Sequence, residues 1–128
     1  MPLETQISVF LRNRVGSLNE LCTALSEAGI NIRAMSTVDD VDWSVVGLIV
    51  DDITKAKKIL DGLGLRYGES TVLTVDIPNR PGAMAEVTRK LSSANINIVH
   101  TFLTATGNNC MVVFLTTDNK KAEEVLRG

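Results

Sequence analysis

Aromatic residues and a surplus of basic charge are what this sequence most clearly lacks. Of its 128 residues only 4% are Phe, Trp or Tyr, and 13 Lys and Arg stand against 15 Asp and Glu. Proteins that bind nucleic acid usually carry a basic patch, often with aromatic side chains that stack on bases. We therefore expect no nucleic-acid partner.

Long apolar runs are also missing. The longest run, residues 45–50, is far shorter than the roughly 20 residues that a membrane-spanning helix needs. The N-terminus has no basic segment followed by an apolar one, which a secretory signal would show. These absences predict a cytoplasmic protein with no membrane partner.

Cysteine and histidine are scarce as well. Cys22 and Cys110 stand alone, without a C-x-x-C pair or the spacing of a zinc site, so we interpret both as small buried thiols in a reducing compartment. His100 lies in an alternating segment, and no geometric reason pairs it with a nucleophile or an acid. The sequence therefore predicts a protein that is not an enzyme and has no catalytic residues.

Three acidic residues, Asp39, Asp40 and Asp42, form the densest run of carboxylates. Such a run between two apolar segments is typical of a solvated hairpin tip, which is a simpler interpretation than a cation site. We therefore expect no metal and no other cofactor.

What the sequence does contain is an internal repeat. Shifted by 66 positions, residues 6–62 align without gaps on residues 72–128, and 17 of the 57 pairs are identical. The matches include Asn13, Arg14 and Gly16, and a second run around Ile30-Asn31-Ile32. The chain is thus a tandem duplication, with units expected at residues 5–70 and 71–128.

The same order of periodicities appears in both units. Ile7, Val9 and Leu11 alternate with polar residues, which predicts a half-buried strand, and an apolar stripe at helical spacing follows. Two more strands and a second helix complete each unit. The predicted helices are residues 17–28, 53–60, 83–94 and 120–126, and the predicted strands after the first are 32–38 and 43–50, then 71–77, 98–104 and 110–117.

Helix ends carry their own signals. Ser17 and Glu20 have the spacing of a capping box, and Asp52 and its repeat partner Asp118 precede the second helices as N-caps. Gly29 and Asn95 tolerate the left-handed conformation that stops a helix.

This order of elements matches the ferredoxin-like βαββαβ plan, an α+β fold with helices packed on an antiparallel sheet. A short fourth strand is predicted at residues 65–67, whereas the second unit lacks its last strand because the sequence ends after its second helix. The strand at 71–77 would then have an open edge, which sheets avoid. We therefore expect the chain to turn at residues 68–70 and to form a hairpin with 71–77.

Asn79-Arg80-Pro81-Gly82 before a helix, with Ile96-Asn97-Ile98 opening the next strand, resembles the ACT domain. The resemblance covers both units and implies ferredoxin-like regulatory modules that bind amino acids and accompany enzymes of amino-acid metabolism. The tandem arrangement is also similar to the regulatory region of aspartokinase. Since no kinase or dehydrogenase domain accompanies the units in this sequence, we expect a stand-alone tandem ACT protein.

The residues themselves also favour a ligand. Glycine at a turn entering a helix lets N–H groups approach an anion such as a carboxylate, and an Asn amide is both donor and acceptor. The candidate ligand-binding residues are Asn13, Gly16, Ser17 and Asn31 in the first unit and Asn79, Pro81, Gly82, Ala83 and Asn97 in the second.

Two functions stay open. Asn and Gly are ordinary turn residues, and Val15 replaces the proline of the second unit, so the first site departs from the pattern. The favoured function is a regulatory module that binds a free small amino acid at unit or subunit interfaces. The resemblance implies that such sites pair Asn13 with Asn97 and Asn79 with Asn31. The alternative is an oligomerisation module with no retained ligand.

Assembly is expected in either case. The second strand of each unit is an edge in this plan, and an unpaired edge invites pairing with another copy. We therefore expect a homodimer or a higher even oligomer, with an amino-acid-metabolic enzyme as a further partner.

Overall fold

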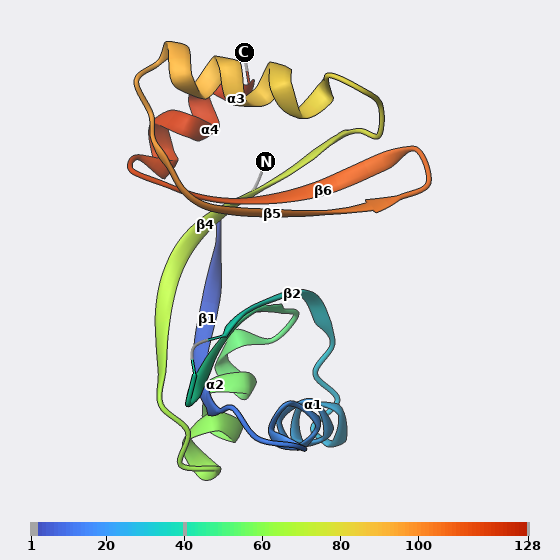
Figure 1. Ribbon diagram of the computed structural model, residues 1–128, viewed down its shortest axis with the longest axis vertical. Coiled ribbons are helices and arrows are strands. Elements are labelled where there is room, and N and C mark those ends of the chain that lie inside the picture. Colours follow the sequence, from blue (N-terminus) through green and yellow to red (C-terminus); the bar gives the residue numbers. More distant parts are fainter. Residues whose placement is uncertain (1–2, 40, 128) are drawn as a thin grey trace. The chain divides into compact units, whose positions relative to one another are not determined.

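Strand, helix, strand, strand and helix follow one another twice along the chain, as the periodicities predict (Figure 1). The computed structural model describes residues 3–39 and 41–127. The elements are β1 (Leu3–Arg12), α1 (Ser17–Glu27), β2 (Ile32–Asp39), β3 (Trp43–Val50), α2 (Ile53–Gly62), β4 (Tyr67–Pro78), α3 (Ala83–Ser93), β5 (Ile98–Thr106), β6 (Asn109–Thr116) and α4 (Asn119–Arg127).

The chain divides into two compact units. The N-terminal unit is Thr5–Ser70, and the C-terminal unit is Thr71–Gly128 together with Met1–Glu4. Both long strands, β1 and β4, therefore contribute residues to each unit. The prediction of an α+β fold with two βαββαβ-like units is confirmed.

In the N-terminal unit, β3 pairs antiparallel with β1 on one side and with β2 on the other. The start of β4 lies along the free side of β1, where the Phe10 N–H donates to the Arg66 carbonyl at 2.9 Å. The strand order β2-β3-β1-β4 leaves β2 as an edge, as predicted.

In the C-terminal unit, β6 pairs antiparallel with β4 and with β5, which leaves β5 as the predicted edge. The other side of β4 is covered by the first residues of β1. There the buried Thr74 hydroxyl donates to a carboxylate oxygen of Glu4 at 2.7 Å. The first described residues of β1 thus lie along β4 in the C-terminal unit, in the place of a fourth strand.

The predicted hairpin at residues 65–77 is wrong. β4 is one uninterrupted strand from Tyr67 to Pro78, visible as a continuous ribbon in Figure 1. Gly68 has no positive φ, so the backbone at this point stays extended. The physical reason is that β1 already pairs the edge of β4, so a returning hairpin strand would have no free edge to occupy.

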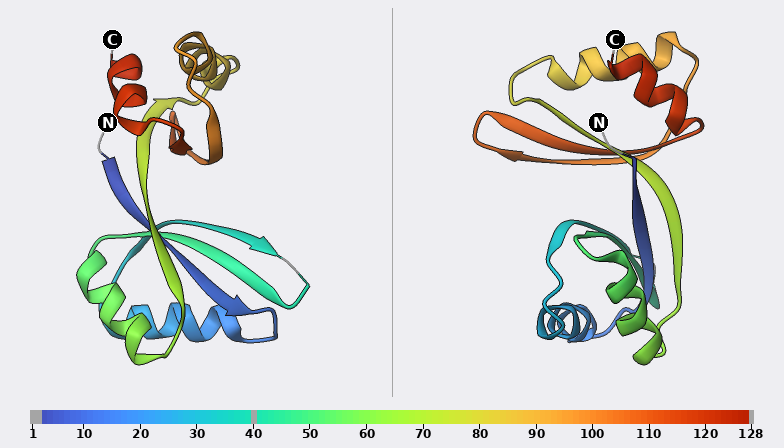
Figure 2. Two further views of the ribbon diagram at one scale, coloured as in Figure 1. Left: turned by 90° about the vertical axis from the view of Figure 1, so that its left-hand side faces the viewer. Right: turned by 180° about the vertical axis from the view of Figure 1, so that it is seen from behind.

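Each unit has its own apolar core between the sheet and two helices on one of its faces (Figure 2). Alternating residues of each strand face the helices, as their period-2 pattern predicts. The N-terminal core comprises Ile7, Val9, Leu11, Leu21, Leu25, Ile30, Val46, Leu48, Val50, Ala56 and Leu60. The C-terminal core comprises Leu73, Val75, Ile77, Ala83, Leu91, Ile96, Cys110, Val112, Phe114, Ala122 and Leu126.

Several helix-end signals are confirmed. The carboxylates of Asp52 and Asp118 accept from the N–H groups of Lys55 and Lys121 at 3.0 Å, as N-caps do. Gly29 and Asn95 take φ values of 74° and 61° where α1 and α3 end.

The capping box of Ser17 and Glu20 is wrong. Gly16 stands at the N-cap of α1, and no side chain caps the helix there. Glu20 instead forms an ion pair with Arg14. Gly16, which turns the chain with a positive φ, occupies the N-cap position that the box assigned to Ser17. Ser17 is therefore the first residue of the helix.

The two helix stops generate a prediction. Gly29→Asn should change the free energy of unfolding by less than about 0.5 kcal/mol, because Asn95 adopts the same conformation in the repeat. Gly29→Val should destabilise by about 1–2 kcal/mol, because a branched side chain resists positive φ. Urea unfolding measures both values.

Gly68→Val is the matched control, since Gly68 also has open space around it but has no positive φ. A loss at Gly68 as large as that at Gly29 would contradict the backbone explanation.

Candidate functional site

The turn from the first strand into the first helix has the same geometry in both units. Gly16 has φ 91° and ψ −10°, and Gly82 has φ 86° and ψ −13°, at the N-caps of α1 and α3. This left-handed conformation favours glycine. Space is not the reason, because a Cβ added at Gly16 would meet no atom within 4 Å.

Backbone N–H groups are free at the start of these helices. The Ala83 N–H donates to the Arg80 carbonyl at 3.2 Å, and that of Glu86 to the Gly82 carbonyl at 3.0 Å. Between them, the N–H groups of Met84 and Ala85 have no acceptor within the described part of the chain. Free N–H groups and the positive end of the helix dipole together favour an anion.

An arginine–glutamate pair that the sequence patterns did not predict holds each turn. Arg14 pairs with Glu20 and Arg80 with Glu86, each at 3.1 Å. The guanidinium groups also donate to the carbonyls of Val15 and Pro81 within the turns. The sequence did contain a signal for this ion pair, because Arg14 and Glu20 are both identical to their repeat partners, Arg80 and Glu86.

The amides of Asn13 and Asn79 fasten these turns to a neighbouring hairpin. Asn79 Nδ2 donates to the Gly107 carbonyl at 2.9 Å, and Asn13 Nδ2 to the Val41 carbonyl at 3.5 Å. Their backbone N–H groups donate to the same hairpins. The amide and backbone N–H groups of Asn13 and Asn79 therefore have a structural role.

The amides of Asn31 and Asn97 are in a different position. Their backbone N–H groups donate to Asp51 Oδ1 at 3.0 Å and to Thr117 Oγ1 at 3.1 Å, which holds the openings of β2 and β5 against the ends of β3 and β6. Both side chains are exposed, and neither amide bonds to any described residue. These two amides are available to a ligand.

One unit alone does not bring its candidate residues together. The glycine turn and the strand-opening Asn lie at opposite ends of α1, an 11-residue helix about 16 Å long. The same holds for α3. The pairings of Asn13 with Asn97 and of Asn79 with Asn31 stay predictions.

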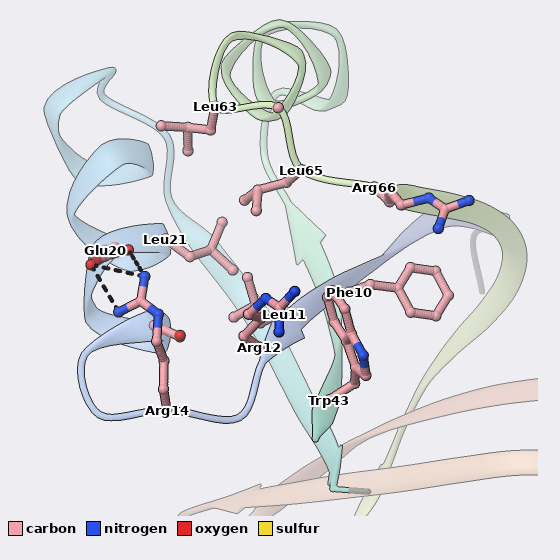
Figure 3. Close-up of a pocket in the computed structure, with 12 residues that line it drawn as sticks. Phe10, Leu11, Arg12, Arg14, Glu20, Leu21, Trp43, Leu63, Leu65 and Arg66 are labelled. Atoms are coloured by element: carbon pink, nitrogen blue, oxygen red, sulfur yellow. Dashed lines mark hydrogen bonds and ion pairs between the residues drawn. The ribbon is translucent and has the colours of Figure 1, made fainter. Parts of the chain in front are cut away.

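A cavity of about 300 Å³ lies beside the turn of the N-terminal unit (Figure 3). Its walls come from the end of β1, the start of α1, the start of β3 and the segment that follows α2. A smaller cavity of about 200 Å³ lies between β4, α3 and α4 in the C-terminal unit.

Other candidate chemistry is sparse. Within residues 3–39 and 41–127, no three His, Cys, Asp or Glu residues gather as metal ligands would. The Asp39 carboxylate accepts from the Ser44 hydroxyl at 2.8 Å, and Asp40 lies outside the described residues. Cys110 is buried and Cys22 half-buried, both as free thiols. No helix in the described part of the chain is long and apolar enough to span a bilayer.

Comparisons with known proteins agree with the fold. Residues 3–127 match the family model of the ACT domain pair. Protein BT0572 of Bacteroides thetaiotaomicron is 31% identical with a TM-score of 0.94, over 98% of this chain and 87% of that one.

Two regulatory subunits of aspartate kinase share the fold at 18% identity, each over 98% of this chain and 90% of the other. The ligand-free subunit of Thermus thermophilus has a TM-score of 0.71, and the subunit of Thermus flavus one of 0.72. No curated protein matches the sequence.

The two kinds of Asn should respond differently to truncation. Asn79→Ala should lower the free energy of unfolding by about 1 kcal/mol, because the hydrogen bond to the Gly107 carbonyl is lost. Asn97→Ala should change it by less than about 0.5 kcal/mol, because its amide has no described partner. Urea unfolding compares the two variants, and equal losses would contradict the assignment of one amide to structure and the other to a ligand.

Proposed function

Because the chain belongs to the ACT domain family, we propose that it is a regulatory module that senses a free amino acid. ACT domains commonly bind amino acids as regulatory modules. The observation that carries the proposal is the repetition, in both units, of a glycine turn with free helical N–H groups and of an exposed strand-opening amide without a described partner.

An amino acid has two charges that these groups suit. Its carboxylate would accept from the N–H groups of Met84 and Ala85 in the C-terminal unit, beyond the Ala83 N–H that the turn already uses. Its ammonium would donate to the amide oxygen of Asn31 or Asn97. Asn79, Pro81 and Gly82 would act by holding the turn in shape, and Asn13, Gly16 and Ser17 do the same in the N-terminal unit.

The regulated partner is proposed to be an enzyme of amino-acid metabolism. The support is the shared fold with the two aspartate kinase regulatory subunits, which cover nearly all of this chain. Within this proposal the protein has a regulatory role and no catalytic one.

A screen of the twenty amino acids by thermal shift tests the proposal, since a ligand that binds the folded state raises its melting temperature. Calorimetry then compares variants with the amino acid found. Asn97→Ala or Asn31→Ala should weaken binding about tenfold to a hundredfold, because a charged group loses its partner. Gly82→Val should weaken it further, because valine resists φ 86°.

Ligand analogues are the controls. The amide of the same amino acid lacks the carboxylate charge and its N-acetyl form lacks the ammonium, so both should bind at least tenfold more weakly. A double-mutant cycle between Gly82 and each strand-opening Asn then measures which pair shares a ligand. If no amino acid binds at millimolar concentration, the sensing function fails and the oligomerisation module takes its place.

Self-association is a separate expectation, supported by apolar side chains on the edge strands. Val38 on β2 and Val99 and Leu103 on β5 are 57%, 59% and 47% exposed. Sedimentation should show a homodimer or a higher even oligomer at micromolar concentration, and Leu103→Lys should shift it towards monomer. Val41→Lys, at an exposed hairpin tip, should not. A monomer at high micromolar concentration, with and without ligand, would contradict the expectation.

A further inference from the structure

The 300 Å³ cavity of the N-terminal unit has a chemistry that the amino-acid proposal does not use (Figure 3). All of its lining residues belong to Thr5–Ser70, so it needs no other part of the chain. Its volume lies at the lower end of the range for small-molecule pockets. Two features of its walls, charge and flat apolar surface, define what it can bind.

The first feature is a surplus of unpaired positive charge. Arg12 and Arg66 line the cavity, and within the described residues neither guanidinium donates a hydrogen bond or pairs with a carboxylate. Arg14 also lines it but is neutralised by Glu20 at 3.1 Å. The cavity therefore has two guanidinium groups without a carboxylate partner among the described residues, in a chain whose net charge is −2. Guanidinium groups bind carboxylates through two parallel hydrogen bonds.

The second feature is a pair of aromatic walls. Phe10 and Trp43 are 42% and 43% exposed, high values for such large apolar side chains. The Arg12 guanidinium carbon lies 4.9 Å from the Trp43 ring centroid, which orients both side chains at the cavity. Phe10, Trp43 and Arg66 also border a second hollow lined by Val45 and Tyr67, so the apolar surface continues beyond the first cavity.

The cavity offers no partner to an ammonium group. Glu20 is the one carboxylate among its lining residues, and Arg14 occupies it. At the neighbouring hollow, the Tyr67 hydroxyl donates to Asp61 Oδ1 at 3.0 Å. Partial burial and this hydrogen bond raise the pKa of Tyr67, so its phenol is neutral. A ligand with an ammonium would therefore meet three guanidinium groups and a single carboxylate that is already paired.

The repeat provides an internal comparison. Asp76, Pro78 and Asn109 stand in the C-terminal unit where Phe10, Arg12 and Trp43 stand in the N-terminal one. The Arg80–Glu86 pair is kept there, but its cavity of about 200 Å³ includes Asp76 and has no aromatic wall. The turn is thus common to both units, whereas the aromatic and cationic walls belong to one of them.

We propose that the N-terminal cavity binds a small aromatic carboxylate without an ammonium group. Its ring packs against Phe10 and Trp43, and its carboxylate accepts hydrogen bonds from Arg66, while Arg12 adds positive charge on the other side of Trp43. The cavity shares Ser17 and the start of α1 with the candidate amino-acid site, but Phe10, Arg12, Trp43 and Arg66 take no part in that site.

Trp43 is the only tryptophan of the chain, so its fluorescence reports on the cavity directly. Titration of the full chain with benzoate should give a saturable change. Benzamide has the same ring without the charge, and cyclohexanecarboxylate has the same charge without the aromatic ring. Both should bind at least fivefold more weakly than benzoate, and inorganic phosphate at least tenfold more weakly.

Arg66→Gln should weaken benzoate binding at least tenfold, and Arg66→Lys by less, because lysine keeps the charge but not the two parallel hydrogen bonds. Arg89→Gln, an exposed arginine on α3, is the matched control and should bind benzoate normally. Circular dichroism should be unchanged in all three variants, since every substituted side chain is exposed.

Several outcomes would overturn the proposal: no saturable change with benzoate, equal binding of benzamide, equal binding of phosphate, or an affinity that Arg66→Gln leaves unchanged. Loss of the fluorescence change on dilution of the protein would mark the face as a contact between copies and would also overturn it. Asn97→Ala should leave benzoate binding intact, and Arg66→Gln should leave amino-acid binding intact, so the two proposals fail separately.

Discussion

The side of β4 that faces away from β6 must be paired, and the rest of this structure depends on that constraint. An open sheet edge has unpaired N–H and C=O groups, and α4 is the last described element of the C-terminal unit. The first residues of β1 cover this edge, and the start of β4 covers β1 in return. Both strands are therefore longer than the repeat requires, at 10 and 12 residues, and the linker between the units is itself a strand.

Once these sheet edges are paired, the turn that follows β1 and the turn that follows β4 occupy the same position within their units. Each has a left-handed glycine, an arginine–glutamate pair at 3.1 Å and an Asn amide bonded to the facing hairpin. Exposed ion pairs contribute little stability on average. Their effect here is on shape, since the guanidinium also donates to a carbonyl of the turn and so presents the first helical N–H groups in one orientation.

The two units differ in character mainly on the outer face of the sheet, because substitutions in the core, such as Leu48 to Phe114, exchange one apolar residue for another. The Asn, Arg and Gly of the turn are kept, while the outer face of the first strand changes from Phe10 and Arg12 to Asp76 and Pro78. Such residues point away from the helices, so they are free of the packing constraint that keeps Ile7, Val9 and Leu11 apolar. One duplicated fold can therefore carry two kinds of ligand chemistry while its core stays apolar.

By itself the sequence determined the order of elements, the helix ends at Asp52, Gly29 and Asn95, the edge strands and the family. All of these depend on local pattern and on the repeat, and local hydrogen bonds and side-chain periodicity decide them. Only the tertiary structure decided which strand pairs with β4, that Glu20 pairs with Arg14 rather than capping α1, and that the Asn79 amide bonds to a hairpin while that of Asn97 does not. These contacts join residues far apart in the chain or alternatives of similar local energy, which spacing alone does not distinguish.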